Sequence, residues 1–200
     1  LITGGHNGIG AAIKEALLTR ANFDIVYSYD LASGSDVRNY PQFERHMAAI
    51  GKIDLLVCCA GICISKPFGE MLPEEFARTV DVNLLGVMNC CHAVLPWIKG
   101  GDIINIASRA GAYGHNNLAA YCASKAGVAM FSEALALDYQ GTNLKLSLDG
   151  TNQERRTDGH TANMVYNQGF DLPKAPQNDH NFANDWEFID TDANYWVGAA

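Results

Sequence analysis

The chain has little positive charge and no long apolar segment. Fourteen Lys and Arg residues stand against 22 Asp and Glu among its 200 residues, which leaves a formal net charge of −8. Nucleic acids and anionic lipid surfaces bind proteins with a broad positive field, so we expect neither as a partner. The longest apolar run, residues 55–64, reaches about half of the length that spans a bilayer, and we expect no membrane helix.

The six cysteines lack the C-x-x-C spacing that many metal and redox sites use. Most of them lie inside apolar runs, which predicts buried free thiols and no metal site. Reduced thiols are typical of a cytoplasmic protein, and the first residues do not resemble a signal peptide. We therefore expect a cytoplasmic location. We also expect that a few residues are missing at either end. The cysteines are Cys58, Cys59, Cys63, Cys90, Cys91 and Cys122.

Apolar and amphipathic segments alternate along residues 1–150. With 48% hydrophobic and 18% charged residues, the chain can bury one sizeable core, and we expect a single domain over residues 1–200. This alternation is typical of an α/β fold, here a doubly wound, Rossmann-type parallel sheet. Residues 151–181 are polar and predict a surface loop beside the substrate. The patterns predict strands over residues 1–2, 24–29, 53–59, 102–107 and 144–148, and helices over 10–20, 40–50, 74–98 and 120–139.

A glycine-rich turn, Thr-Gly-Gly-His-Asn-Gly-Ile-Gly at residues 3–10, separates the first strand from the first helix. Glycines allow a tight turn and let backbone N–H groups face a pyrophosphate, although a purely structural turn also fits the pattern. Asp30 lies 20 positions beyond Gly10, at the end of the second predicted strand. A carboxylate there accepts hydrogen bonds from ribose hydroxyls and repels a 2′-phosphate, which favours NAD over NADP.

A second group of residues, Ser108, Tyr121 and Lys125, has the chemistry of an acid–base site. Tyr121 and Lys125 are one helical turn apart, so they share a face of the predicted helix. A phenol with a pKa of about 10 is a poor catalyst at pH 7, but a neighbouring ammonium stabilises the phenolate and lowers that pKa. Ser108 follows the carboxyl end of a predicted strand, where a hydroxyl can polarise a carbonyl oxygen. Any one of these residues alone is more often structural.

These motifs, in this order and spacing, resemble those of the short-chain dehydrogenase/reductase family. The family's T-G-x-x-x-G-x-G turn corresponds to residues 3–10, its Y-x-x-x-K pair to Tyr121 and Lys125, and its catalytic serine to Ser108, 13 residues before the tyrosine. The resemblance implies that Tyr121 is the general acid or base, that Lys125 lowers its pKa and holds the nicotinamide ribose, and that Ser108 orients the substrate. Asn83 matches the family's fourth catalytic residue, which holds a water in the proton relay.

The resemblance extends to the cofactor site, and the implied cofactor is NAD. Asp36 and Val37 match an Asp-Val pair on the adenine side, and residues 191–198 resemble the segment that leads into the family's last strand. The residues that we expect to contact NAD are Gly4, His6, Asn7, Gly8, Ile9, Gly10, Asp30, Asp36, Val37, Ala60, Gly61, Tyr121 and Lys125.

The resemblance implies an oxidoreductase that transfers a hydride between NAD(H) and a secondary alcohol or ketone. The polar residues 151–181 favour a small or polar substrate such as a sugar, a polyol or a hydroxy acid. Many family members assemble through two long helices, which here correspond to residues 74–98 and 120–139. We therefore expect a homodimer or a homotetramer.

Departures from the family pattern support an alternative, a non-catalytic NAD-binding or regulatory protein that keeps the fold. Residues 58–59 are cysteines where the family has asparagines, and Asp149 replaces a proline. Glu154 stands where a threonine usually contacts the nicotinamide carboxamide. Only five residues separate Asp30 from Asp36, so we expect the helix usually found there to be missing or reduced.

Overall fold

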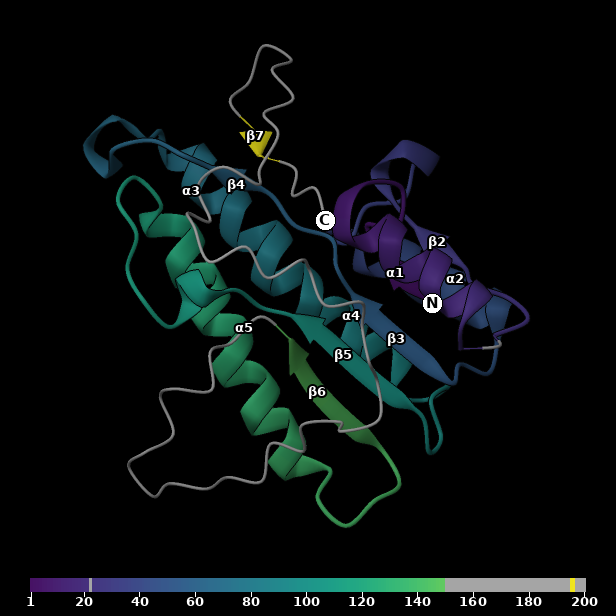
Figure 1. The fold of residues 1–200 in the computed structure, drawn as a ribbon. Coiled ribbons are helices and arrows are strands. Elements are labelled where there is room, and N and C mark those ends of the chain that lie inside the picture. The colour runs from purple at the N-terminus through teal and green to yellow at the C-terminus, as the bar shows by residue number, and fades with distance from the viewer. Residues whose placement is uncertain (22, 150–194, 197–200) are drawn as a thin grey trace.

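The computed structural model describes residues 1–21, 23–149 and 195–196, and a parallel sheet forms its centre (Figure 1). The strands are β1 (Ile2–Thr3), β2 (Ser28–Tyr29), β3 (Leu55–Cys58), β4 (Cys63–Ile64), β5 (Asp102–Ile106), β6 (Lys145–Asp149) and β7 (Tyr195–Trp196). Five of them form one sheet in the order β2-β1-β3-β5-β6, with every neighbouring pair parallel. The remaining two, β4 and β7, pair antiparallel in a separate ladder.

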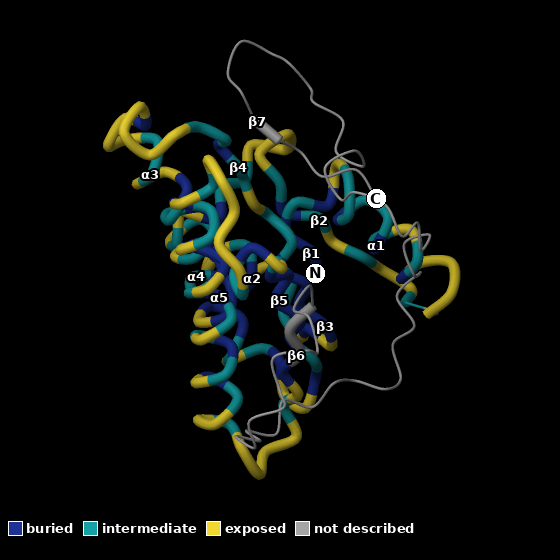
Figure 2. The backbone as a smooth tube through the Cα atoms, turned by 60° about the vertical axis from the view of Figure 1, so that its left-hand side comes forward, coloured by how far each residue is buried: buried dark blue, intermediate teal, exposed yellow. Residues whose placement is uncertain are grey.

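Helices cover both faces of this sheet. Figure 2 shows α1 on one side of the strands and α2, α4 and α5 on the other. This arrangement confirms the predicted Rossmann-type α/β architecture. The helices are α1 (Gly8–Thr19), α2 (Tyr40–Ile50), α3 (Pro73–Val80), the π-helical η3 (Asp81–Leu85), α4 (Gly86–Val94) and α5 (Ala119–Asp138), with short 3₁₀ turns η1 (Leu31–Ser33), η2 (Phe68–Glu70) and η4 (Arg109–Gly111).

Alternate side chains of each central strand enter opposite cores. Leu56 and Ile103 pack into the core beneath α2, α4 and α5, whereas Val57 and Ile104 pack into the smaller core beneath α1. Successive side chains of a strand point to opposite faces, and both faces are covered here. The near-continuous apolar sequence of these strands follows from that double coverage.

Two predicted elements differ from the structure. The strand expected over residues 24–29 is restricted to Ser28–Tyr29, because β2 is an edge strand that pairs only with the short β1. The helix expected over residues 74–98 is interrupted by η3 and ends at Val94, two residues before Pro96, which has no N–H to continue the helix. The reduced connection after Asp30 is confirmed, because the 3₁₀ turn η1 takes the place of a helix. The predicted polar loop at residues 151–181 lies outside the described residues.

All six cysteines are free thiols, as predicted, but only half of them are buried. Cys58, Cys90 and Cys91 are buried, whereas Cys59, Cys63 and Cys122 are partly exposed. Among the described residues, no cluster of His, Cys, Asp and Glu side chains has the arrangement of a metal site. None of the helices in residues 1–21 and 23–149 combines the length and the apolar character that crossing a bilayer requires.

A buried polar bridge joins β5 to α5 through the larger core. The Asn105 side-chain amide donates to Ser132 Oγ at 2.9 Å, and Ser132 in turn donates to the Val128 carbonyl at 2.8 Å. Cys91 Sγ lies 3.5 Å from Asn105 Oδ1 on the other side. Asn105 is 0% exposed, so water cannot replace a lost partner.

Replacing Ser132 with alanine should lower the free energy of unfolding by about 1–3 kcal/mol, because the buried Asn105 amide loses its acceptor. Urea denaturation of both proteins measures the difference. Glu15→Ala on α1 is the control, since Glu15 is exposed and its loss should change stability by less than about 0.5 kcal/mol. Equal stabilities for Ser132→Ala and wild type would show that the bridge contributes nothing.

Candidate functional site

The glycine-rich turn brings two backbone segments into close contact at the carboxyl end of β1. Gly4 has a φ of 70° and Gly8 a φ of 52°, a region that favours glycine. A Cβ at Gly4 would lie 2.8 Å from Ala60 Cα, and one at Gly10 would collide with the Gly4 carbonyl oxygen. The turn therefore needs glycine at positions 4 and 10, because its own backbone packs too closely there for a side chain.

Thr3 ties this turn to the loop that follows β3. Its Oγ1 accepts hydrogen bonds from the backbone N–H groups of Cys59 and Ala60, both at 3.1 Å. Thr3 is 1% exposed, so this contact is shielded from water. This role of Thr3 does not follow from its sequence position, at the end of a strand before a glycine turn, because the partners lie more than 50 residues away in the chain.

Asp30 lies beside the turn, as predicted. Its Oδ2 accepts the backbone N–H of His6 at 3.1 Å, and its Oδ1 accepts that of Ala32 at 2.9 Å. The Asp30 side chain remains 15% exposed, and each oxygen has a further lone pair. Asn7 precedes α1 without a side-chain cap, so the helix N-terminus next to Asp30 presents N–H groups suited to an anion.

Asn83 anchors the loop after β3 from the π-helical turn η3. Its Oδ1 accepts the Ile62 N–H at 2.8 Å, and its Nδ2 donates to the Ile62 carbonyl at 2.8 Å and to Ser124 Oγ at 3.1 Å. Ser124 donates in turn to the Tyr121 carbonyl at 2.8 Å. Asn83 thus connects η3, the Ile62 loop and the turn of α5 that carries Tyr121. Ser124 was not singled out in the sequence, because one serine inside a helix carries no distinctive signal.

Ser108, Tyr121 and Lys125 come together at the carboxyl end of β5. The Ser108 hydroxyl is hydrogen-bonded to the Tyr121 phenol, and its Oγ also accepts the Ala110 N–H at 3.1 Å. Lys125 Nζ donates to the Ile106 carbonyl at 2.8 Å and lies 5.9 Å from the centre of the Tyr121 ring. The structure therefore brings together three residues that the sequence separates.

Burial controls the charge states of Tyr121 and Lys125. It raises the pKa of Tyr121 to about 12, an effect that the Ser108 hydrogen bond opposes. It also lowers the pKa of Lys125 to about 8. The predicted lowering of the Tyr121 pKa by Lys125 is thus not the dominant effect, because removing a phenol from water disfavours its charged form. At pH 7 the phenol is protonated, and Lys125 carries its positive charge.

Asp36 and Val37 lie at the other end of the candidate site. Asp36 is held by Arg38, whose Nε and backbone N–H both donate to Asp36 Oδ1, and the ion pair with Nη2 measures 2.6 Å. The Arg38 hydrogen bond lowers the pKa of the Asp36 carboxyl. The Val37 carbonyl accepts the Asn89 amide at 3.0 Å, and a Cβ at Gly86 would lie only 2.7 Å from Val37 Cγ2.

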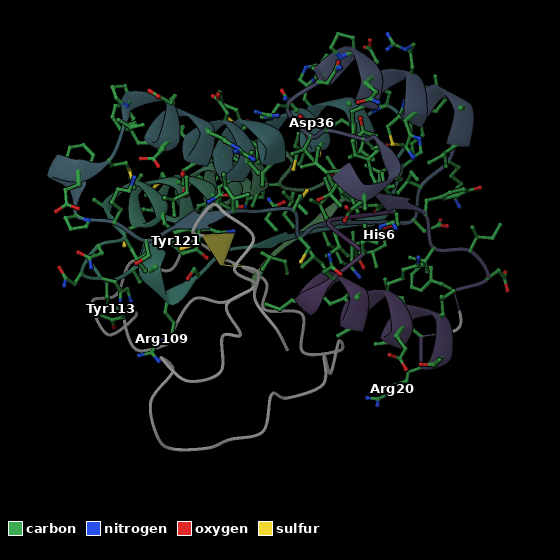
Figure 3. All side chains as sticks on the ribbon, turned by 90° about the horizontal axis from the view of Figure 1, so that it is seen from above. His6, Arg20, Asp36, Arg109, Tyr113 and Tyr121 are labelled. Atoms are coloured by element: carbon green, nitrogen blue, oxygen red, sulfur yellow. The ribbon has the colours of Figure 1, made fainter. Side chains whose placement is uncertain are left out.

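Gly61 lies beside the acid–base groups. A Cβ at Gly61 would lie 3.3 Å from Asn83 Oδ1 and 3.8 Å from Lys125 Nζ. Figure 3 shows Tyr121 on one side of the molecule and His6 and Asp36 on the other, with the strands between them. The predicted residues therefore form an elongated arrangement along one end of the sheet, with acid–base groups at one extreme and Asp30 and Asp36 at the other.

The sheet order and the glycine turn at the end of its first strand define a Rossmann-type α/β protein. A family model described as short chain dehydrogenase matches residues 19–148. The chain belongs to the short-chain dehydrogenase family.

Several characterised proteins are similar to the chain. The 2-dehydro-3-deoxy-L-rhamnonate dehydrogenase (NAD(+)) of Sphingomonas sp. (strain SKA58) is 31% identical over 163 residues, which cover 70% of this chain and 66% of the relative. The galactitol 2-dehydrogenase of Agrobacterium fabrum is 33% identical, with 75% of this chain and 68% of the relative covered. The crystal structure of serine dehydrogenase from Escherichia coli superposes with a TM-score of 0.66 at 27% identity, over 74% of this chain and 79% of that one. The chain spans about two thirds of the length of these two curated relatives.

The burial of Lys125 makes stability depend on pH. Its pKa of about 8 lies below the ordinary value of 10.5, so the unfolded chain binds more protons between these values and stability rises with pH across that range. Raising the pH from 7.5 to 10 should therefore stabilise the wild type by about 2 kcal/mol relative to Lys125→Met, which has no ammonium to titrate.

Urea denaturation of the cofactor-free proteins at both pH values measures this difference. Lys99→Met, at an exposed lysine, is the matched control. If the difference in unfolding free energy between wild type and Lys125→Met did not change with pH, the burial of a titrating ammonium would be contradicted.

Proposed function

We propose that the protein is an NAD(H)-dependent oxidoreductase that interconverts a secondary alcohol and a ketone. The observation that carries this proposal is the half-buried Tyr121 phenol, hydrogen-bonded to Ser108 and one helical turn from Lys125. A phenol and a hydroxyl that converge in this way can bind one carbonyl oxygen between them. The family membership of the chain supports the same chemistry.

Each residue has a distinct role in ketone reduction. Ser108 donates a hydrogen bond to the carbonyl oxygen of the substrate, and Tyr121 transfers its proton to that oxygen. The raised pKa of Tyr121 supports this role, because it keeps the phenol protonated at pH 7. Lys125 places a positive charge beside the phenolate that remains. Asn83 holds the Ile62 loop and, as the family resemblance implies, a water for the return of the proton. In alcohol oxidation the proton moves the opposite way.

The nicotinamide cofactor supplies the hydride acceptor or donor when it is bound. The glycine turn and the uncapped start of α1 fit its pyrophosphate. Asp30 fits the adenosine ribose, Asp36 and Val37 fit the adenine side, and Lys125 with Tyr121 fits the nicotinamide ribose. The residues assigned to the turn and to the loop after β3 are Gly4, His6, Asn7, Gly8, Ile9, Gly10, Ala60 and Gly61.

We propose a small polyhydroxylated substrate, a polyol or a sugar acid. The names of the two curated relatives, one acting on a deoxy sugar acid and one on galactitol, support this class. The homodimer or homotetramer expected from the sequence stays a prediction. Met130 and Leu137 on α5, which are 66% and 58% exposed, support it.

Replacing Tyr121 with phenylalanine should lower turnover at least about 100-fold, because the proton donor is lost. NADH affinity should stay within about fivefold of wild type, since only one hydroxyl is removed. Absorbance of NADH with a panel of polyols and their ketones measures turnover, and nicotinamide fluorescence measures binding. Tyr139→Phe, just after the end of α5, is the matched control.

Unchanged turnover in Tyr121→Phe would contradict this mechanism. A wild-type protein that binds NADH but turns over no alcohol or ketone would support the second candidate, a non-catalytic NAD-binding or regulatory protein. The cysteines at residues 58–59, where the family has asparagines, favour that alternative.

The wild-type protein should bind NADH more tightly than NADPH, because the Asp30 carboxylate repels a 2′-phosphate. Asp30→Asn removes the charge and keeps an acceptor for the Ala32 N–H, so the preference for NADH should fall at least about tenfold. Fluorescence titration with both cofactors tests this, with Asp24→Asn as the control at an exposed aspartate. A preference for NADPH in the wild type would overturn the assignment of Asp30.

A further inference from the structure

The loop of residues 34–37 has an unusual position at the edge of the sheet. It is part of the connection from η1 to α2, residues 34–39, and it carries Asp36 and Val37. β2 is the last strand at this edge, and no strand in the described part of the chain lies beyond it. The backbone of residues 34–36 therefore has no ladder to hold it, and its hydrogen bonds must come from elsewhere.

Local backbone bonds supply some of these, from the Gly34 N–H to the Leu31 carbonyl at 2.9 Å and from the Ser35 N–H to the Asp30 carbonyl at 3.0 Å. Gln42, in the first turn of α2, supplies two more. Its Nε2 donates to the Gly34 carbonyl at 2.9 Å, and its Oε1 accepts the Asp36 N–H at 3.2 Å. One side chain thus bonds the backbone on both sides of residue 35. The position of Gln42 is itself set by Asn39, whose Oδ1 accepts the Gln42 N–H at 3.1 Å and caps α2.

Tyr29 completes the contact from inside the core. Its hydroxyl donates to Gln42 Oε1 at 3.2 Å and lies 3.4 Å from the Asp36 carbonyl oxygen. The ring is 1% exposed and packs edge-to-face on Phe43, with 4.7 Å between the ring centres. A rigid, buried ring therefore holds the Gln42 amide, which in turn holds the Asp36 backbone.

We propose that Gln42, oriented by Tyr29, is the positioning residue of the adenine end of the cofactor site. The inference rests on the proposed function, because it takes Asp36 and Val37 as the contacts of the adenine ring. Gln42 does not touch the ligand in this scheme. It acts by holding the Gly34 and Asp36 backbone, a task that a neighbouring strand would perform in a wider sheet.

The test separates the two halves of the cofactor. Gln42→Met keeps the length of the side chain and removes its two hydrogen bonds to the loop backbone and the one from Tyr29. NADH and AMP should therefore bind about tenfold more weakly. Reduced nicotinamide mononucleotide, which lacks the adenosine half, should bind as it does to wild type. In steady-state kinetics the KM for NADH should rise while kcat is unchanged.

Two further variants make the result specific. Gln42→Glu keeps the acceptor for the Asp36 N–H but loses the donor to Gly34, so it should recover part of the AMP affinity. Tyr29→Phe, which keeps the buried ring, should weaken AMP binding about threefold. Gln140→Met is the matched control, because Gln140 follows α5 at the opposite edge of the sheet.

Hydrogen exchange gives a readout that does not depend on any ligand. The Asp36 amide should exchange faster in Gln42→Met than in wild type, and equally in Gln140→Met. If Gln42→Met bound AMP as tightly as the wild type does, the inference would be overturned. It would also be overturned if the variant lost affinity for reduced nicotinamide mononucleotide as much as for AMP, because that result indicates a general disruption. A wild-type protein that binds neither NADH nor AMP overturns the proposed function and with it the adenine role. NADH binding with unaltered AMP affinity in Gln42→Met overturns this inference alone.

Discussion

The side-chain amide of Asn83 bonds both the N–H and the carbonyl of Ile62, and it does so at a position with 0% exposure. At such depth there is no water to replace a lost partner, so a shift of either group would leave strong donors and acceptors unpaired. Through Ser124 the same amide reaches the turn of α5 that carries Tyr121. The geometry of the candidate acid–base site depends on this network, and the π-helical turn at Asp81–Leu85 is the local distortion that accompanies it.

Burial is also what makes Tyr121 and Lys125 chemically unusual. The same loss of water raises the pKa of the phenol to about 12 and lowers that of the ammonium to about 8. Both shifts in pKa favour the neutral form of the side chain. The Ser108 hydrogen bond acts in the opposite sense to burial at Tyr121. A small set of neighbouring groups therefore decides how readily a proton moves.

The cofactor end shows how the fold tolerates a shortened connection. Between Asp30 and Asp36 a single 3₁₀ turn replaces a longer excursion of the chain, and Asp30 caps that turn through the Ala32 N–H. The sheet consequently ends at β2, and side chains take over hydrogen bonds that strands provide elsewhere. Gln42 does this for the Asp36 backbone, and Thr3 does the equivalent for the loop after β3. Hydrogen bonds between these side chains and the backbone keep both segments beside the glycine turn.

The sequence alone determined the α/β class, the five strands of the parallel sheet and the helices between them, and the glycine turn, because apolar periodicity and glycine spacing are local properties of the chain. It also identified Ser108, Tyr121 and Lys125 by their spacing. It did not predict the short strand β4. It did not reveal the length of β2, the π-helical interruption of the long helix, or the roles of Thr3, Ser124 and Gln42. Those depend on which groups lie nearby in space, and a single serine or glutamine carries no local mark of its partner. Ser124, for example, bonds Asn83, which lies 41 residues away in the chain. The direction of the Tyr121 pKa shift was likewise decided only by tertiary structure, because desolvation depends on how much of the fold surrounds the phenol.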